Sequence, residues 1–239
     1  HKAIRRQRQM CIRDSNWSLS TDTGKNLFSP GKTPSQNALF LLLLAAFLKG
    51  VDDYQELLRC SVAFAGNDHR LGAQEAPPAI ISVFLGTDLE GIIDAIVGDN
   101  NYTAPEHKSL RIGVDVLPSI PQDTTDRNRT SPLAFTGNKF EFRMPGSSQS
   151  IAGPITILNA IMADELDQFY ETLKDASDFT AALHKLIRDT FSAHRRIIFS
   201  GNGYEDAWIR EAEKRGLANL HNTAEALPTY IPVSYTHLT

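Results

Sequence analysis

The sequence is poor in cysteine, in net charge and in long apolar runs. Its two cysteines, Cys11 and Cys60, form neither a CxxC pair nor a disulfide framework, which favours a reducing, cytoplasmic location. The net charge of the 239 residues is −4, so no overall positive field attracts nucleic acid or an anionic membrane. The longest apolar run, 38–48, is shorter than the about 20 residues of a membrane span. It therefore predicts a buried helix.

The two ends of the chain differ from its interior. Residues 1–15 show no amphipathic period and no secretory signal, and interpretable sequence begins at Asn16. This stretch and 233–239 resemble translated sequencing-adapter read-through, although a disordered tail and a frayed terminus would look much the same. We therefore expect 16–232 to be one partial domain, with extensions at 1–15 and 233–239 that are not native to it.

Hydrophobic periodicity predicts strands in the middle of the chain and helices behind them. A helix that Ser35 can cap is expected to continue to residue 66, either as a hairpin or as one kinked helix. Further elements follow from the same patterns: strands near 16 and over 79–86, 111–121 and 139–144, and helices over 88–98, 151–174, 177–195 and 204–215, the last closed by Gly216. This order lacks the βαβ regularity of a doubly wound fold. It predicts an α+β domain with an antiparallel sheet backed by helices.

In KFEFRM (139–144), charged and apolar side chains alternate with the period of a strand. Lys139, Glu141 and Arg143 should therefore share one face, while the apolar residues between them face the core. Cross-strand ion pairs on a solvated face are the ordinary explanation of such a pattern. A carboxylate between two cations can also ligate Mg²⁺ or Mn²⁺ while the cations bind anionic groups, as phosphoryl transfer requires.

Two loops carry the other concentrations of charge. The loop 67–78 is bounded by glycine and proline and carries Asp68, His69, Arg70 and Glu75. These side chains are either surface residues of a turn or part of a mobile flap that brings charge to a small substrate. In the polar loop 122–132, Arg127 and Arg129 either pair with nearby acids or bind phosphate, whose oxygens match the guanidinium fork.

Taken together and in this order, these blocks resemble those of a known family. Signature blocks of type III glutamine synthetases are similar to GNDHRLGAQEAPPAIISVFLG, to DTTDRNRTSPLAFTGNKFEFRMPGSSQSIAGP and to the opening NWSLSTDTGKNLF. The resemblance covers nearly all of 16–230. It implies part of the catalytic domain of an enzyme that ligates ammonia to glutamate with ATP, through γ-glutamyl phosphate.

The resemblance also implies roles for particular residues toward glutamate and ammonia. Arg70 resembles the family arginine that holds the glutamate carboxylate, and Arg143 the one that contacts the glutamate side chain. Glu75 resembles the flap glutamate that closes the site and helps to deprotonate ammonium. The spacing from Arg70 to Glu75 is one residue shorter than in type I enzymes.

Toward the nucleotide, the resemblance implies ATP contacts from Asn16, Ser18 and Lys139. Arg129 resembles the arginine that contacts the ATP phosphates and the transferring phosphoryl group. Glu141 resembles a metal-binding carboxylate for Mg²⁺ or Mn²⁺. A further arginine that type I enzymes place shortly downstream of Arg129 is missing from this chain.

The same resemblance implies a parent enzyme that is a large homo-oligomer of stacked rings, with further metal ligands upstream of this chain. The substrates would be glutamate, ammonia and ATP, with no nucleic-acid or membrane partner. Two alternatives stay open. One is a non-catalytic fragment or interaction module, favoured by the missing upstream carboxylates. The other is a γ-glutamyl amide ligase that uses an amine, which the block 66–78 argues against.

Overall fold

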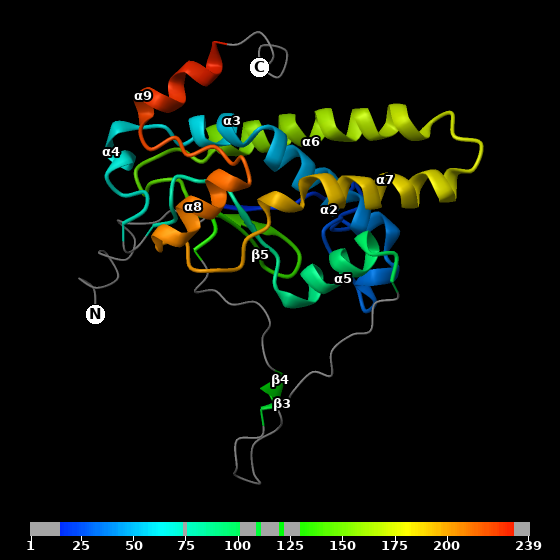
Figure 1. The fold of residues 1–239 in the computed structure, drawn as a ribbon. Helices are drawn as coiled ribbons and strands as arrows, with labels where there is room; N and C mark the ends of the chain where they lie inside the picture. The colour runs from blue at the N-terminus through cyan, green and yellow to red at the C-terminus, as the bar shows by residue number, and fades with distance from the viewer. Residues whose placement is uncertain (1–14, 74–75, 101–108, 111–119, 122–129, 232–239) are drawn as a thin grey trace.

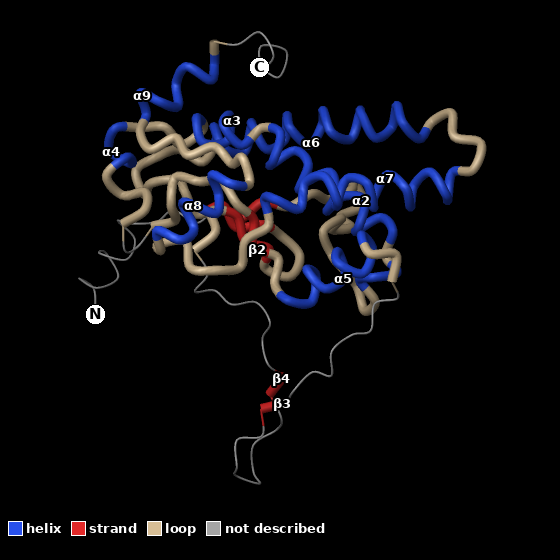
Figure 2. Tube along the Cα trace, in the orientation of Figure 1, coloured by secondary structure: helices blue, strands red, loops and turns tan. Residues whose placement is uncertain are grey.

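A four-stranded sheet lies at the centre of the fold, and helices pack around it (Figure 1; Figure 2). The computed structural model describes residues 15–73, 76–100, 109–110, 120–121 and 130–231. The strands follow the order β1-β6-β5-β2 across the sheet. Their bounds are Ser15–Trp17 for β1, Val83–Phe84 for β2, Leu133–Phe135 for β5 and Phe140–Phe142 for β6.

The predicted α+β class is confirmed, with a refinement at one edge of the sheet. Strand β6 pairs antiparallel with both β1 and β5, whereas β2 pairs parallel with β5. The nitrogen of Thr136 donates to the oxygen of Lys139 at 2.9 Å, and a turn this tight joins antiparallel strands. The connection from β2 to β5 contains helix α5 (Thr87–Val97). It is long enough for the crossover that a parallel pair needs.

Aromatic side chains fill the space between the sheet and helix α2 (Ala38–Asp53). Phe47 of the helix stacks on Phe140 of β6 with ring centroids 3.6 Å apart, and it also stacks on Trp17 of β1 at 5.7 Å. Because α2 is apolar almost all round, it can be covered on several sides at once. The sequence prediction of a buried helix here is confirmed, since Phe40, Leu44 and Leu48 are fully buried.

Helices α6 (Ala152–Leu173) and α7 (Phe179–His194) run side by side and pack on α2 (Figure 1). Among the described residues, no helix is both long and apolar enough to cross a membrane. The remaining helices are α3 (Gln55–Cys60), α4 (Ala65–Asp68), α8 (Asp206–Lys214) and α9 (Thr223–Ala226), with 3-10 turns η1 (Pro34–Gln36), η2 (Arg195–Ile197) and η3 (Leu227–Tyr230). Gly216 follows α8 with φ +70°, the left-handed conformation expected of a residue that ends a helix.

The first predicted helix differs from the structure at its start. It was expected to be capped by Ser35, but α2 begins at Ala38 and its cap is Asn37, whose side chain accepts from the nitrogen of Phe40 at 3.1 Å. Ser35 lies inside the preceding turn η1, so its hydroxyl is one turn too early. The open choice between hairpin and kinked helix resolves into two successive helices, α2 and α3, separated by Tyr54.

The strand expected over 79–86 shortens to the two residues of β2. Its neighbour β5 pairs with it only at Leu133 and Ala134, so the ladder cannot extend further on that side. The rest of the segment is buried without regular pairing, apart from a single bridge from Ile80 to Asn219. Most of the predicted strand 111–121 lies outside the described residues. At its end, β4 (Ile120–Pro121) pairs antiparallel with β3 (Ser109–Leu110).

Candidate functional site

The outer face of the sheet carries the predicted ladder of charged side chains. Phe140 and Phe142 of β6 are fully buried on the core side, and Glu141 between them points to the other face, as the period of two requires. Across the sheet, Glu141 lies opposite Asn16 of β1 and Ala134 of β5. Residues that are directly opposite in an antiparallel pair share a face. The structure therefore places Asn16 beside Glu141.

Glu141 and Arg143 form an ion pair along this face. The guanidinium of Arg143 donates from Nε at 3.0 Å and from Nη2 at 2.8 Å, both to Oε2 of Glu141. The side chains of Glu141 and Arg143 keep 18% and 12% of their exposure. The pair is thus half-buried and reachable. A bound anion or metal ion would replace one of these charge-assisted contacts.

Arg70 is attached to the end of the same strand. Its Nε donates to Oδ1 of Asn67 at 2.8 Å, and its Nη2 donates to the carbonyl oxygen of Met144. The amide of Asn67 is buried and donates at 3.1 Å to that same carbonyl and to the carbonyl of Val62. Since Met144 directly follows Arg143, the structure brings Arg70 next to the end of β6. We call this arrangement of Asn67, Arg70 and Met144 the Asn67 clasp.

Sequence reasoning missed Asn67, although it lies in one of the charged loops. A buried asparagine whose amide is fully hydrogen-bonded holds its neighbours in one geometry. Nothing local distinguishes it from a turn residue, because its partner Met144, which connects it to β6, is 77 positions away. Only a pairing of the two loops in three dimensions could have shown its role.

Asp68, in the same loop, contacts Thr223 at the start of α9. Asp68 accepts from the backbone nitrogen of Thr223 at 2.9 Å and from its hydroxyl at 3.0 Å, and it pairs with Arg59 at 3.3 Å. Burial alone would raise the pKa of Asp68, but the hydrogen bonds from Thr223 and Arg59 outweigh it and hold the pKa below its usual value. Asp68 thus anchors the start of α9. His69 is exposed.

At the opposite end of β6, Lys139 is exposed and Ser18 is half-buried. The hydroxyl of Ser18 lies 2.9 Å from the carbonyl oxygen of Asn138 and 3.1 Å from Oδ1 of Asn26. Asn26 donates to the carbonyl of Asn138 as well, at 3.0 Å. These contacts tie the segment after β1 to the turn before β6. Ser18 and Lys139 therefore lie at one end of the strand and Arg70 and Arg143 at the other.

Two predicted site residues, Glu75 and Arg129, lie outside the described residues. The nearest described neighbour of Glu75 in the chain is Ala76, and that of Arg129 is Thr130. The predicted convergence of Arg70, Arg129, Glu141 and Arg143 on one cleft stays a prediction as far as Arg129 is concerned.

Charged groups also gather away from the sheet, and they differ from a ligand site in being paired with one another. Asp52, Asp53 and His194 offer oxygen and nitrogen atoms within 4.8 Å of one another. Cations already occupy these positions, because Arg196 donates to Asp52 at 2.9 Å and Lys49 donates to Asp53 at 2.8 Å. The cluster therefore serves to join helices.

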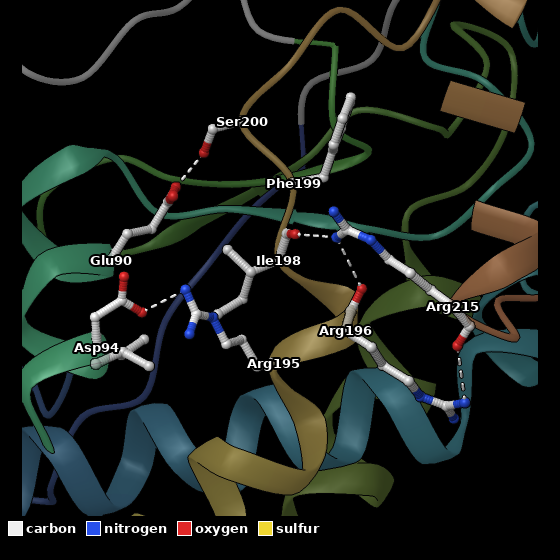
Figure 3. Close-up of a pocket in the computed structure, with 9 residues that line it drawn as sticks. Glu90, Asp94, Arg195, Arg196, Ile198, Phe199, Ser200 and Arg215 are labelled. Atoms are coloured by element: carbon white, nitrogen blue, oxygen red, sulfur yellow. Dashed lines mark hydrogen bonds and ion pairs between the residues drawn. The ribbon is translucent and has the colours of Figure 1, made fainter. Parts of the chain in front are cut away.

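A pocket of about 390 Å³ lies between α5 and residues 195–200 (Figure 3). Its three arginines each bind a carboxylate: Arg195 pairs with Asp94 at 2.7 Å, Arg196 with Asp52 and Arg215 with Glu211 at 3.0 Å. None of the residues predicted from the sequence lines it. Its charges hold neighbouring segments together and do not converge on a ligand.

Comparison with known proteins finds a family that is similar to the C-terminal part of the chain and relatives that are similar to most of it. Residues 182–239 match the family described as the glutamine synthetase C-terminal domain. The matched range includes 233–239, whose foreign origin stays a prediction.

The chain is also similar to three proteins named as glutamine synthetases. The chain is 51% identical over 89% of its length to a type-3 glutamine synthetase of Dictyostelium discoideum. It is 47% identical over 90% of its length to a glutamine synthetase of Bacteroides fragilis, and 43% identical over 91% to one of Butyrivibrio fibrisolvens. The chain spans 29% to 31% of the length of these proteins. The predicted resemblance to type III glutamine synthetases is confirmed, and it extends over nearly the whole chain.

Proposed function

We propose that this chain supplies part of the active site of a glutamate–ammonia ligase, which uses ATP to form glutamine through γ-glutamyl phosphate. The observation that carries the proposal is the Asn67 clasp. It puts Arg70, from a loop 74 positions away, beside the strand that carries Glu141 and Arg143. A carboxylate paired with one arginine, with a second arginine held at the end of the same strand, suits an anionic substrate and its phosphorylation.

The layout of β6 suggests how the substrates divide along it. Arg70 and Arg143, at the end of the strand, would hold the two carboxylates of glutamate, since guanidinium forks match carboxylates. Lys139 and Ser18, at the start, would contact the nucleotide, together with Asn16, which lies opposite Glu141. The γ-phosphate of ATP would then meet the glutamate side chain near Glu141, in the middle.

Glu141 fits a metal site in part. Its Oε2 accepts both hydrogen bonds from Arg143, so Oε1 is the oxygen that Mg²⁺ or Mn²⁺ would use. Bound there, the ion would neutralise charge on the transferring phosphoryl group. Among the described residues, the only carboxylate assigned to this face is Glu141, while Mg²⁺ takes an octahedral set of oxygens. The proposal therefore requires further ligands from the rest of a parent protein.

Two residues outside the described part of the chain complete the proposal. Arg129 would stabilise negative charge on the transferring phosphoryl group. Glu75 would accept a proton from ammonium, so that ammonia can attack the γ-glutamyl phosphate and displace phosphate. Arg70 and Arg143 would hold the acyl group in place during both steps.

The names of the relatives favour ammonia over the alternative of an amine as the acceptor, since three similar proteins are called glutamine synthetases. A cytoplasmic enzyme and a ring-shaped homo-oligomer remain parts of the proposal. The free thiol of Cys60 is compatible with a reducing compartment. A fragment that folds without turning over stays the second candidate, because Glu141 alone binds a metal weakly.

The test compares the 239-residue chain with a complete parent enzyme that contains it, measuring phosphate release that depends on ATP, glutamate and ammonia. We expect no glutamine from the chain alone. In the complete enzyme, Glu141→Gln should lower kcat by about 10²-fold, the effect of losing one preorganised group that stabilises charge. Glu171→Gln is the matched control, because Glu171 lies on α6 with 56% exposure.

Each outcome bears on a different part of the proposal. An inactive complete enzyme would refute the ligase reaction. Turnover by the short chain at the rate of the complete enzyme would show that Glu141 needs no further metal ligands. Equal activity of Glu141→Gln and Glu171→Gln would remove Glu141 from the site.

A further inference from the structure

The segment 198–203, which follows η2, lies along the edge of the sheet beside β2. Ile198 forms a parallel bridge with Val83, and the nitrogen of Phe199 donates to the carbonyl of Val83 at 2.9 Å. On its other side, the carbonyl of Phe199 accepts from the hydroxyl of Ser131 at 2.7 Å. This part of the chain is thus hydrogen-bonded both to β2 and to the residues that lead into β5.

The turn that follows makes a close backbone contact with two other loops. The nitrogen of Gly203 donates to the hydroxyl oxygen of Thr130. A Cβ atom on Gly203 would lie 2.7 Å from that oxygen and 3.1 Å from Cγ of Pro78. Real Cβ atoms essentially never approach another atom to 2.7 Å, and a contact of 3.1 Å is tighter than most. The ring of Pro78 is stiff. Only glycine permits the backbone of residue 203 to touch both neighbours.

Both neighbours stand within three positions of a predicted catalytic residue. Thr130 directly follows Arg129, and Pro78 comes three positions after Glu75. Neither contact was foreseen from the sequence, in which Gly203 belongs to a short polar stretch between two helices. The turn around Gly203 therefore contacts the residues that follow both predicted catalytic groups, Thr130 after Arg129 and Pro78 after Glu75.

Side chains of α5 and of Arg215 also hold the segment 198–200, as Figure 3 shows. Arg215 donates from Nη1 to the carbonyl of Ile198 at 2.8 Å, and the hydroxyl of Ser200 donates to Glu90 of α5. The ring of Phe199 stacks on Trp208 of α8 with centroids 3.6 Å apart. The arginine-lined pocket thus belongs to a support that fixes the backbone of 198–200.

We propose that the turn at 201–204 is a positioning element for the ligase reaction, with Gly203 and Thr130 as its positioning residues. It holds Thr130, which directly follows Arg129, by a hydrogen bond, and it packs against Pro78, three positions after Glu75. This inference rests on the proposed function and assigns a role in it to the C-terminal part of the chain. A displacement of about 1 Å at a catalytic group can cost about 10²-fold in rate.

A positioning role for the turn should affect kcat and the KM for glutamate differently. Glutamate is assigned to Arg70 and Arg143, and neither residue is next in the sequence to Thr130, to Pro78 or to the turn. Loosening the turn should therefore lower kcat and leave the KM for glutamate little changed. A purely structural role would instead lower stability and affect both constants through loss of folded enzyme.

The experiment uses a complete enzyme that contains this chain, with Gly203→Ala, Thr130→Val and Thr130→Ser. Gly203→Ala should lower kcat by about 10²-fold. Thr130→Val removes the hydroxyl that accepts from Gly203, so it should also lower kcat. Thr130→Ser keeps that hydroxyl and should retain most of the kcat of the unaltered enzyme. Gly153→Ala is the matched control, since a Cβ there meets only the oxygen of Ser61 at 3.7 Å.

The outcomes separate this inference from the proposed function. If the unaltered enzyme makes no glutamine, the proposed function fails. If it is active and Gly203→Ala behaves like Gly153→Ala, the positioning role is overturned. It is also overturned if Thr130→Ser loses as much activity as Thr130→Val, or if the KM for glutamate rises in step with the fall in kcat. Should Gly203→Ala not fold, the two Thr130 variants decide the matter.

Discussion

Charged side chains occupy two regions of this molecule in contrasting ways. On the outer face of the sheet, Glu141 and Arg143 pair with each other and remain reachable. Between helices α2, α6 and α7, Asp52 and Glu165 are 1% and 0% exposed. Both side chains of this pair keep some exposure, so a ligand can reach the pair and replace one partner. A buried carboxylate that loses its partner is left as an isolated charge. The first arrangement suits binding and the second suits the joining of helices.

The helical region is held by carboxylates of α2 and α6. Asp52 accepts from Nε of Arg196 at 2.9 Å and lies 2.8 Å from Nδ1 of His194 at the end of α7. Glu165 of α6 lies 2.7 Å from Nζ of Lys49 on α2. Each pair crosses from one helix to another element. None of these groups offers a free charge to a ligand.

The largest expected effect on stability is therefore at Asp52. Asp52→Ala should lower the free energy of unfolding by about 2–3 kcal/mol, as expected for charged hydrogen bonds. The loss should stay below that of a fully buried pair, because Arg196 keeps 41% of its exposure and can be solvated. Urea unfolding of the 239-residue chain measures it.

Asp53→Ala provides the control for that measurement. Asp53 is the next residue and pairs with Lys49, but it is 38% exposed, so its loss should cost less than about 1 kcal/mol. Equal effects of the two substitutions would mean that burial does not separate structural from reachable charges here.

The difference between the regions also explains what the sequence could predict. The alternation in KFEFRM is local, and it correctly indicated that Glu141 and Arg143 face away from the core. The helices over 151–174 and 177–195 were likewise predicted within a few residues of α6 and α7, because their apolar period lies within each segment.

What the sequence could not show depends on contacts between distant segments. The pairing of Asp52 with Arg196 spans 144 positions, and the Asn67 clasp joins two loops. The length of β2 was overestimated because a strand ends where its partner ends, and its partner is β5. The placement of Gly203 against Thr130 has no signal in either local sequence.

A second prediction uses the opposite pKa shifts of two carboxylates. Burial raises the pKa of Glu165 above its ordinary value of 4.5, despite the nearby Lys49. The pKa of Asp68 lies below its usual value of 3.8, because the hydrogen bonds from Thr223 and Arg59 outweigh the effect of burial. Glu165 contributes stability that is fully present below its unfolded pKa and is lost as the pH rises through the folded value. Asp68 contributes stability that is present at neutral pH and is lost as the pH falls through its folded value.

Unfolding measured from acid to neutral pH should separate these two contributions. The unaltered chain should lose free energy of unfolding at Glu165 as the pH rises, and Glu165→Gln should not show this loss. The unaltered chain should also lose free energy of unfolding at Asp68 as the pH falls, and Asp68→Asn should not show that loss. We expect each effect to be smaller than that of Asp52→Ala, since each substitution keeps a neutral polar side chain of similar shape in place of the carboxyl group. Parallel pH profiles for the two variants would contradict the assignment of opposite shifts.

The smallest expected effect is at Asp178, which caps α7 in the exposed turn between α6 and α7. Its carboxylate accepts from the nitrogen of Ala181 at 3.0 Å, a local contact that the sequence pattern at the start of this helix allows one to anticipate. Asp178→Ala should lower the free energy of unfolding by about 1 kcal/mol, whereas Asp178→Asn should keep most of the cap. Both are measured by urea unfolding beside Asp52→Ala. Because a cap acts within one helix and Asp52 acts between elements, the cap variant should cost less and should leave the sheet face untouched. A loss at Asp178 equal to that at Asp52 would show that the packing of α2 against α7 contributes less than the local order of α7.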